Sequence, residues 1–136
     1  MRAVDKAGRT PLHYAALSDD ADEVLTLLAA SADADAQDVE GFTPLHLAAQ
    51  EGAVAAARVL LDHGAAVDAE NVHGNTPLFV AVFNSRGRGD LIELLRGRGA
   101  DPFHVNRSGQ TPIGLARLIG NFDVARFFGD LNDNPT

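Results

Sequence analysis

The chain repeats the stretch Asp38-Val39-Glu40-Gly41-Phe42-Thr43-Pro44-Leu45-His46 in four recognisable copies. The other copies begin at Asp5, Asn71 and Asn106, and each keeps an aspartate or asparagine, a glycine three positions later and a Thr-Pro pair. The threonines of successive copies lie 33, 33 and 35 residues apart. Self-similarity at a fixed period of this length is typical of repeat proteins.

Each copy has the chemistry of a turn that leads into a helix. Gly41 and its counterparts can supply the positive φ that a tight turn needs. Thr43 can cap a helix through its hydroxyl, and Pro44 suits the first helical position, where no backbone donor is required. The sequence therefore predicts a short helix after every Thr-Pro pair, built on Leu12, Ala15 and Ala16 in the first copy and on Leu45, Ala48 and Ala49 in the second.

A second helix is expected in every copy from the spacing of its apolar residues. These residues are Val24, Leu27 and Leu28; Val54, Val59, Leu60 and Leu61; Leu91, Ile92, Leu94 and Leu95; and Phe122, Val124, Phe127 and Phe128. Gly64 and Gly99 are expected to end the second helices of copies two and three. One helix pair cannot bury its apolar face alone, so the copies must stack and share a continuous core.

With four such copies, the sequence resembles an ankyrin-repeat protein from about Asp5 to Phe128. The resemblance implies an all-α fold, a solenoid of four stacked helix–turn–helix repeats with turn or hairpin fingers. The expected repeats cover about 5–37, 38–70, 71–105 and 106–129 of a single domain over 1–129, followed by a polar C-terminal tail at 130–136.

Several positions depart from the repeat pattern. Asp19 and Ser31 stand in the first copy where other copies have glycine, and because Asp tolerates the left-handed region we expect the fold to survive. The first copy is nevertheless expected to be the least stable. Phe79 and Gly114 replace the histidine of the first two copies, and the third copy has two extra residues within 84–90.

Composition excludes several classes of protein. The absence of cysteine rules out disulfides, iron–sulfur clusters and cysteine-based zinc sites. No apolar run approaches the roughly 20 residues that cross a bilayer. Met1–Asp5 lacks the apolar core of a signal peptide, so we expect a cytoplasmic protein with no membrane partner.

Charge is unevenly distributed along the chain. The formal net charge is −8, with −9 in residues 1–85 and +1 in residues 86–136. Nucleic acid is not an expected partner, because binding its backbone needs a basic face. The acidic half should instead favour a basic protein partner by electrostatic complementarity.

The residues offer no machinery for catalysis, so we expect no enzyme activity, cofactor or metal. His13 and His46 recur at one position of the repeat, which indicates imidazoles that hydrogen-bond near a turn and tie adjacent loops. No pair of histidines has metal-ligand spacing, and no serine lies in a nucleophile-elbow motif. The acidic run Asp19–Glu23 is interpreted as a solvated helix start.

Four arginines, Arg86, Arg88, Arg96 and Arg98, bracket the second helix of the third copy. They are either solvated loop residues or a docking patch for an acidic partner segment. The tripeptide 88–90 has the composition of a cell-adhesion motif, which we interpret as coincidence.

The resemblance also implies where a ligand binds, because ankyrin repeats hold partner proteins on the concave face of turn tips and first helices. Phe42 and Phe83 are either binding anchors on this face or residues packed against neighbouring turns. The expected partner-binding residues, which include two arginines of the loop before the third copy's second helix, are Arg9, Leu17, Val39, Glu40, Phe42, Gln50, Glu51, Val72, His73, Asn75, Phe83, Asn84, Arg86 and Arg88.

The sequence therefore predicts a non-catalytic, monomeric protein-binding module. An alternative is an immunity-type inhibitor of a bacterial toxin or enzyme, since the last copy is similar to the final repeat of small stand-alone bacterial ankyrin proteins. A further alternative is a self-associating structural domain.

Overall fold

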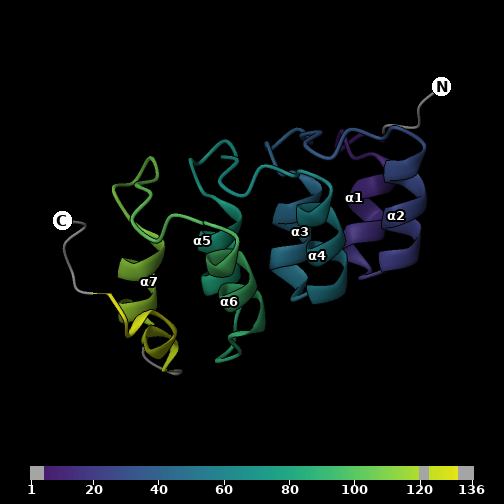
Figure 1. Cartoon of the computed structure of the whole chain (residues 1–136). Helices are drawn as coiled ribbons and strands as arrows, with labels where there is room; N and C mark the ends of the chain where they lie inside the picture. Colours follow the sequence, from purple (N-terminus) through teal and green to yellow (C-terminus); the bar gives the residue numbers. More distant parts are fainter. Residues whose placement is uncertain (1–4, 120–122, 132–136) are drawn as a thin grey trace.

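The computed structural model describes residues 5–119 and 123–131 and contains there seven α-helices, one 3-10 helix and no strand. Figure 1 shows the helices as pairs stepped along one axis, from the N-terminal pair to the C-terminal pair. The elements are α1 (Pro11–Leu17), α2 (Ala21–Ala29), α3 (Pro44–Glu51), α4 (Val54–Asp62), α5 (Pro77–Phe83), α6 (Asp90–Gly97), α7 (Pro112–Leu118) and η1 (Val124–Phe128).

The first helix of each pair begins at the predicted Thr-Pro boundary. Thr43 has extended backbone, accepts a hydrogen bond from His46 N and is followed by Pro44 at the first position of α3. The same arrangement starts α1, α5 and α7. Because the cap and the proline both stabilise a helix start, each of these helices begins at a fixed residue.

The second helices turn one apolar face to the core and end at left-handed residues. In α4 this face consists of Ala56, Ala57 and Leu60, all fully buried. Gly64 has φ +89°, and Ala65 N and Gly64 N donate to Leu60 O and Leu61 O, which is the pattern of a glycine-terminated helix end. Gly99 ends α6 in the same way, as the sequence predicts.

Stacking of neighbouring pairs buries one continuous core. Helix α1 packs on α3, α3 on α5 and α5 on α7, while α2 packs on α4 and α4 on α6. Leu12, Leu45, Leu78 and Ile113 occupy the same position in the four first helices and are all buried. The loops that join one repeat to the next lie along the upper edge of Figure 1, and those within a repeat lie along the lower edge. The all-α repeat solenoid is therefore confirmed.

The last helix differs from its prediction. Where a second helix like the others was expected, the described residues form the 3-10 helix η1, and its N-cap Asp123 makes no side-chain capping bond. No further repeat follows to pack against this helix within the described residues. Phe122, which was predicted to belong to this helix, and residues 132–136 of the expected tail lie outside the described residues.

Two departures of the first repeat have the expected backbone. Asp19 and Ser31 have φ values of +56° and +73°, so each adopts the left-handed conformation that glycine takes elsewhere. Asp19 has a second role that the sequence did not predict. Its Oδ1 accepts a hydrogen bond from Ala56 N, 2.9 Å away, in the first turn of α4. Because the N-cap Ala53 makes no side-chain bond, the first repeat caps a helix of the second.

The loop before α6 is held against the last repeat. A Cβ at Gly89 would clash with the ring of Phe127, so a larger residue there would have to displace that ring. Arg126 donates to Gly87 O at 3.2 Å. Gly89 is buried and Asp90 is the first residue of α6, so the tripeptide 88–90 is not an extended, exposed loop.

Candidate functional site

The turn before each Thr-Pro pair forms a finger, and the four fingers are residues 5–9, 38–42, 71–75 and 106–110. Each finger is closed by one side chain. Asn71 Oδ1 accepts hydrogen bonds from His73 N at 2.9 Å and Asn75 N at 3.1 Å. Asp5, Asp38 and Asn106 make the equivalent pair of bonds in their own fingers. An aspartate or asparagine at this position therefore closes the turn of the finger through bonds within the same repeat.

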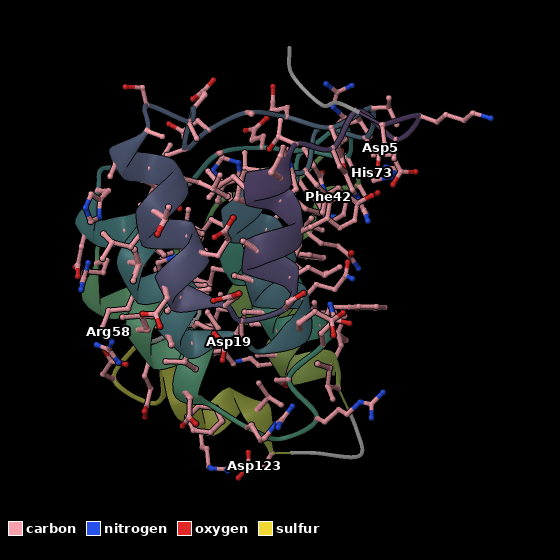
Figure 2. All side chains as sticks on the ribbon, turned by 90° about the vertical axis from the view of Figure 1, so that its right-hand side faces the viewer. Asp5, Asp19, Phe42, Arg58, His73 and Asp123 are labelled. Carbon is pink, nitrogen blue, oxygen red and sulfur yellow. The ribbon has the colours of Figure 1, made fainter. Side chains whose placement is uncertain are left out.

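Adjacent fingers are joined by backbone hydrogen bonds. Val39 N donates to Ala7 O at 2.9 Å, Val72 N to Glu40 O at 3.0 Å, and Arg107 N to His73 O at 3.1 Å. The four fingers consequently form a continuous row whose tips project from one side of the stack. In Figure 2 the labelled finger residues Asp5, Phe42 and His73 gather at the upper right, whereas Asp19 lies far below them.

Two of the fingers are each tied by a histidine to the first helix of the preceding repeat. Thr43 N donates to His46 Nδ1 at 3.1 Å, and His46 Nε2 lies 2.8 Å from Asn75 O. Because a carbonyl only accepts, the proton sits on Nε2 and the ring is neutral. His13 makes the same two contacts, with Thr10 N and Phe42 O. The predicted scaffold role of both histidines is confirmed.

Burial of His46 disfavours its charged form. Desolvation lowers its pKa below the usual value of 6.5, although the carbonyl of Asn75 and the charge of Asp38 act in the opposite direction. The neutral imidazole is the form that fits this position, where Nδ1 already receives a donor.

The residue before each capping Thr faces the turn-closing residue of the next finger. Arg9 Nε lies 3.3 Å from Asp38 Oδ2, and Asn106 Nδ2 donates to Asn75 Oδ1 at 2.7 Å. The equivalent pair between these two is Phe42 and Asn71. The side chain of Phe42 has no hydrogen-bond acceptor. Asn71 Nδ2 is accordingly the only buried side-chain polar atom of the described residues without a hydrogen-bond partner.

A hollow of about 290 Å³ opens at this unmatched pair, on the side of the fingers and first helices. Its lining is mainly apolar and amide, and contains no Lys, Arg, Asp or Glu. The lining residues are Phe42, Gln50, Asn71, His73, Asn75, Phe79, Val80, Phe83 and Asn84. The hollow therefore lies between repeats two and three, with one wall from each.

The neighbouring part of the face, in the first repeat, is polar and already satisfied. Tyr14 donates a hydrogen bond to Asp5, and this bond holds the pKa of Asp5 below its usual value. The guanidinium of Arg9 lies 5.8 Å from the Tyr14 ring centroid while it pairs with Asp38. Arg9 is thus already engaged in contacts within the chain, and it lies beside the hollow and does not line it.

Apart from Arg9, the predicted site residues divide into three groups. Six of them line the hollow: Phe42, Gln50, His73, Asn75, Phe83 and Asn84. Exposed residues flank it on the fingers and at the end of α3, namely Val39, Glu40, Glu51 and Val72, while Leu17 is half-buried at the end of α1. Arg86 and Arg88 are exposed but belong to the loop after α5, at the end of that helix opposite the fingers.

The sequence left two roles open for each phenylalanine, and the two residues differ. Phe83 is 69% exposed, so its ring faces solvent at the rim of the hollow. Phe42 is half-buried, and its ring centroid lies 5.4 Å from that of His46 in a tilted arrangement. Phe42 therefore packs on its own repeat while one side of it faces the hollow.

The four arginines do not form one docking patch, which was one of the two interpretations that the sequence left open. Arg96 makes a two-pronged ion pair with Asp130 and donates to Phe127 O, all at 2.8 Å. Arg98 pairs with Asp62 at 2.8 Å. Because helix α6 separates Arg86 and Arg88 from this second pair, and carboxylates neutralise the second pair, the four do not share one positive patch.

Three lining residues were missed by the sequence analysis: Asn71, Phe79 and Val80. The pattern that could have revealed Asn71 is the pairing of positions 9 with 38, 42 with 71, and 75 with 106. Two of these pairs are polar matches, and the middle one joins a phenylalanine to an asparagine. Because Phe42 cannot hydrogen-bond through its side chain, this mismatch indicates that the amide of Asn71 lacks the partner that the other two fingers have.

The described residues contain no group of three His, Asp or Glu side chains that could hold a metal ion. Within the same ranges, no helix combines the length and apolar character that crossing a membrane requires.

Comparison with known families identifies the repeat. Residues 12–106 match the family model for ankyrin repeats, in three copies. No curated protein matches the chain.

Proposed function

Since the chain belongs to the ankyrin-repeat family, we propose that it binds a partner protein through the face of its fingers and first helices. Ankyrin repeats are in general protein–protein interaction modules and typically non-catalytic. The proposal extends this role to the present chain and centres the binding face on the hollow between repeats two and three. It treats residues 1–129 as one binding domain.

The observation that carries the proposal is the group of exposed apolar side chains around the hollow. Phe83 and Val39 are 69% and 67% exposed, and Val72 is 45% exposed. None of the three is needed to bury the core or close a finger. Exposed apolar residues grouped beside an uncharged hollow are the features of an interaction site, and aromatic side chains are frequent anchors there.

The test is capture of a partner from a lysate of the native host, with a matched pair of variants. Phe83→Ala removes an exposed ring from the proposed face, and Leu25→Ala removes an exposed apolar side chain from α2, outside that face. Both positions are exposed, so both variants should keep their helical circular dichroism. We expect Phe83→Ala to weaken capture about 30-fold and Leu25→Ala to leave it unchanged. Equal capture by both variants would refute the proposed face.

A second candidate is an inhibitor that blocks a basic toxin or enzyme. The charge of −9 over residues 1–85 favours it, because a negative field speeds the encounter with a basic protein. The acidic run at Asp19–Glu23, however, lies at the end of the first helices opposite the fingers, as Figure 2 shows for Asp19. The negative field would then attract the basic partner before it docks on the fingers. Binding of the captured partner should therefore weaken steeply with salt. Affinity that is indifferent to salt would exclude this candidate.

Two further expectations need their own measurements. A monomeric state is proposed, and light scattering should give a mass near 14.3 kDa at every concentration. A mass that rises with concentration would favour a self-associating domain. A cytoplasmic location is a prediction of the sequence that cell fractionation can test.

A further inference from the structure

We propose that the hollow takes a tyrosine side chain of the partner protein, with the phenolic oxygen accepting a hydrogen bond from Asn71 Nδ2. This inference rests on the proposed function, because it specifies what the same face recognises. It starts from Asn71 Nδ2, the buried side-chain donor that has no acceptor within the described residues.

Asn71 is held rigidly in place and is only 4% exposed. Its Oδ1 is used twice by its own finger, which fixes the direction of the amide and leaves Nδ2 pointing away from the turn. The neighbouring fingers satisfy the equivalent atom from within the chain, through Arg9 in one case and Asn75 in the other. Folded proteins rarely leave a buried donor unpaired, so an acceptor from outside would complete the site.

The walls of the hollow favour an aromatic ring. Phe42, Phe79 and Phe83 contribute three rings and Val80 an aliphatic surface. Aromatic rings pack well in tilted or offset arrangements, as Phe42 already does with His46. A volume of about 290 Å³ lies at the lower limit of pockets that hold whole small molecules, so a single side chain is the appropriate guest.

The tip of the guest must be a neutral acceptor. Without a lysine or arginine in the lining, a carboxylate would lose its water with no opposite charge to replace it. An ammonium group would meet another donor, and a phenylalanine would leave Asn71 unpaired. A phenol is neutral at pH 7 and both accepts and donates. Its own proton can go to Asn84 Oδ1, since Asn84 Nδ2 is already bound to Val80 O.

Access to the donor runs past Phe42. Asn71 Nδ2 is covered in the free protein, and Phe42 is the side chain that stands opposite it. For a guest to reach the amide, the half-buried Phe42 side chain would have to rotate aside. The displaced ring then lies beside the incoming one.

The experiment is an NMR titration of the full chain with two probes, p-cresol and toluene. They share the ring and methyl group of a tyrosine side chain and differ only in the hydroxyl. We expect p-cresol to bind about three- to tenfold more tightly and to shift the side-chain NH₂ resonances of Asn71. A purely apolar hollow would favour the more apolar toluene. Equal or tighter binding of toluene would overturn the proposal, and this comparison needs no variant.

A matched pair of substitutions at Phe42 isolates the hydrogen bond. Phe42→Asn copies the neighbouring pair, in which Asn75 Oδ1 accepts from Asn106, so the new amide should occupy Asn71 Nδ2. The preference for p-cresol should then disappear. Phe42→Leu removes the ring but supplies no acceptor, so both probes should bind more weakly and the preference should remain. A preference that survives in Phe42→Asn, or that vanishes in Phe42→Leu, would contradict the proposal.

Failure of the tyrosine site and failure of the proposed function are distinguishable. If p-cresol shows no advantage while Phe83→Ala still loses the partner, the face is correct and the guest is wrong. If Phe83→Ala captures the partner normally, the face itself is wrong, whatever the probes do.

Discussion

At the scale of single residues, Gly41 is the turn glycine of the fingers that leaves the least room for a Cβ. Its φ is +80°, and a Cβ there would lie 2.8 Å from Val72 N and 2.9 Å from Asn71 Cα. Gly41→Ala therefore combines left-handed strain with a clash against backbone. We expect the substitution to lower the free energy of unfolding by about 2–4 kcal/mol, measured by urea denaturation.

Gly64 is the matched control for this prediction. Its φ is +89°, but no atom lies within 4 Å of a Cβ built there. Gly64→Ala should cost only the backbone strain, about 1–2 kcal/mol. Equal losses in the two variants would show that contact between the fingers adds nothing to stability, contrary to the structure.

His46 predicts how stability depends on pH. Folding lowers its pKa below 6.5, so above pH 6.5 the ring is neutral in both states and its full contribution is present. As the pH falls below 6.5, the unfolded chain binds a proton that the folded chain resists, and the free energy of unfolding decreases until the folded pKa is reached. Urea midpoints at about pH 7.5 and about pH 5 measure this change.

The chain itself offers a control for the pH experiment, because Phe79 fills the position of His46 in the third repeat. His46→Phe removes the titrating ring together with its bond to Asn75 O. Its stability should be lower at pH 7.5 and should decrease less toward pH 5 than that of the unsubstituted protein. Identical pH dependences of the two proteins would remove His46 as the cause.

At the scale of elements, helix α4 depends on a side chain from another repeat. Asp19 Oδ1 supplies the capping bond to Ala56 N, because Ala53 cannot. Asp19→Ala should cost about 1–2 kcal/mol, while Asp19→Asn keeps both the acceptor and a residue that tolerates positive φ. Chemical denaturation should place Asp19→Asn within about 0.5 kcal/mol of the unsubstituted protein. Similar losses in both variants would rule out the cap.

The helices that begin with Thr-Pro could be predicted to the residue, because Thr43 and its counterparts carry the cap within their own sequence. The cap of α4 could not, since its acceptor comes from a residue 37 positions earlier. The 3-10 form of η1 also escaped prediction. Its apolar spacing is that of a helix, but the spacing does not show how a terminal repeat is packed.

The candidate site was predictable in part for the same reason. Phe83 and His73 lie at positions where the repeat leaves side chains free, so the sequence pointed to them. Arg9 occupies such a position too, yet it is engaged by Asp38 on the next finger. The unpaired state of Asn71 follows from what the neighbouring finger presents, and only the stacked structure shows that.

At the scale of the whole molecule, the stack is stabilised by hydrogen bonds between neighbouring repeats. The boundary between repeats three and four lacks one of these bonds. The first two boundaries have a histidine bond from helix to finger, through His13 and His46. At the third boundary Phe79 offers no such bond. Because repeat proteins are stabilised by nearest neighbours, the last repeat should open first. This prediction replaces the expectation, based on Asp19 and Ser31, that the first copy is the least stable.

Phe79→His should restore the missing bond, from its ring to Gln110 O. We expect amide hydrogen exchange in α7 and η1 to slow by about three- to tenfold, with no change in α1 and α2. Ser31→Gly, which relieves a left-handed residue in the first repeat, is the control, and it should leave exchange in α7 unaltered. A uniform change along the chain in either variant would show that the repeats unfold together.

The claim that a partner protein sits on the fingers and first helices is tested most directly by hydrogen exchange of the chain bound to its captured partner. The account predicts slower exchange at residues 39–42 and 72–75 and at the C-terminal ends of α3 and α5, with α2, α4 and α6 unaffected. Protection confined to α2, α4 and α6 would place the partner on the opposite side of the stack and contradict the account.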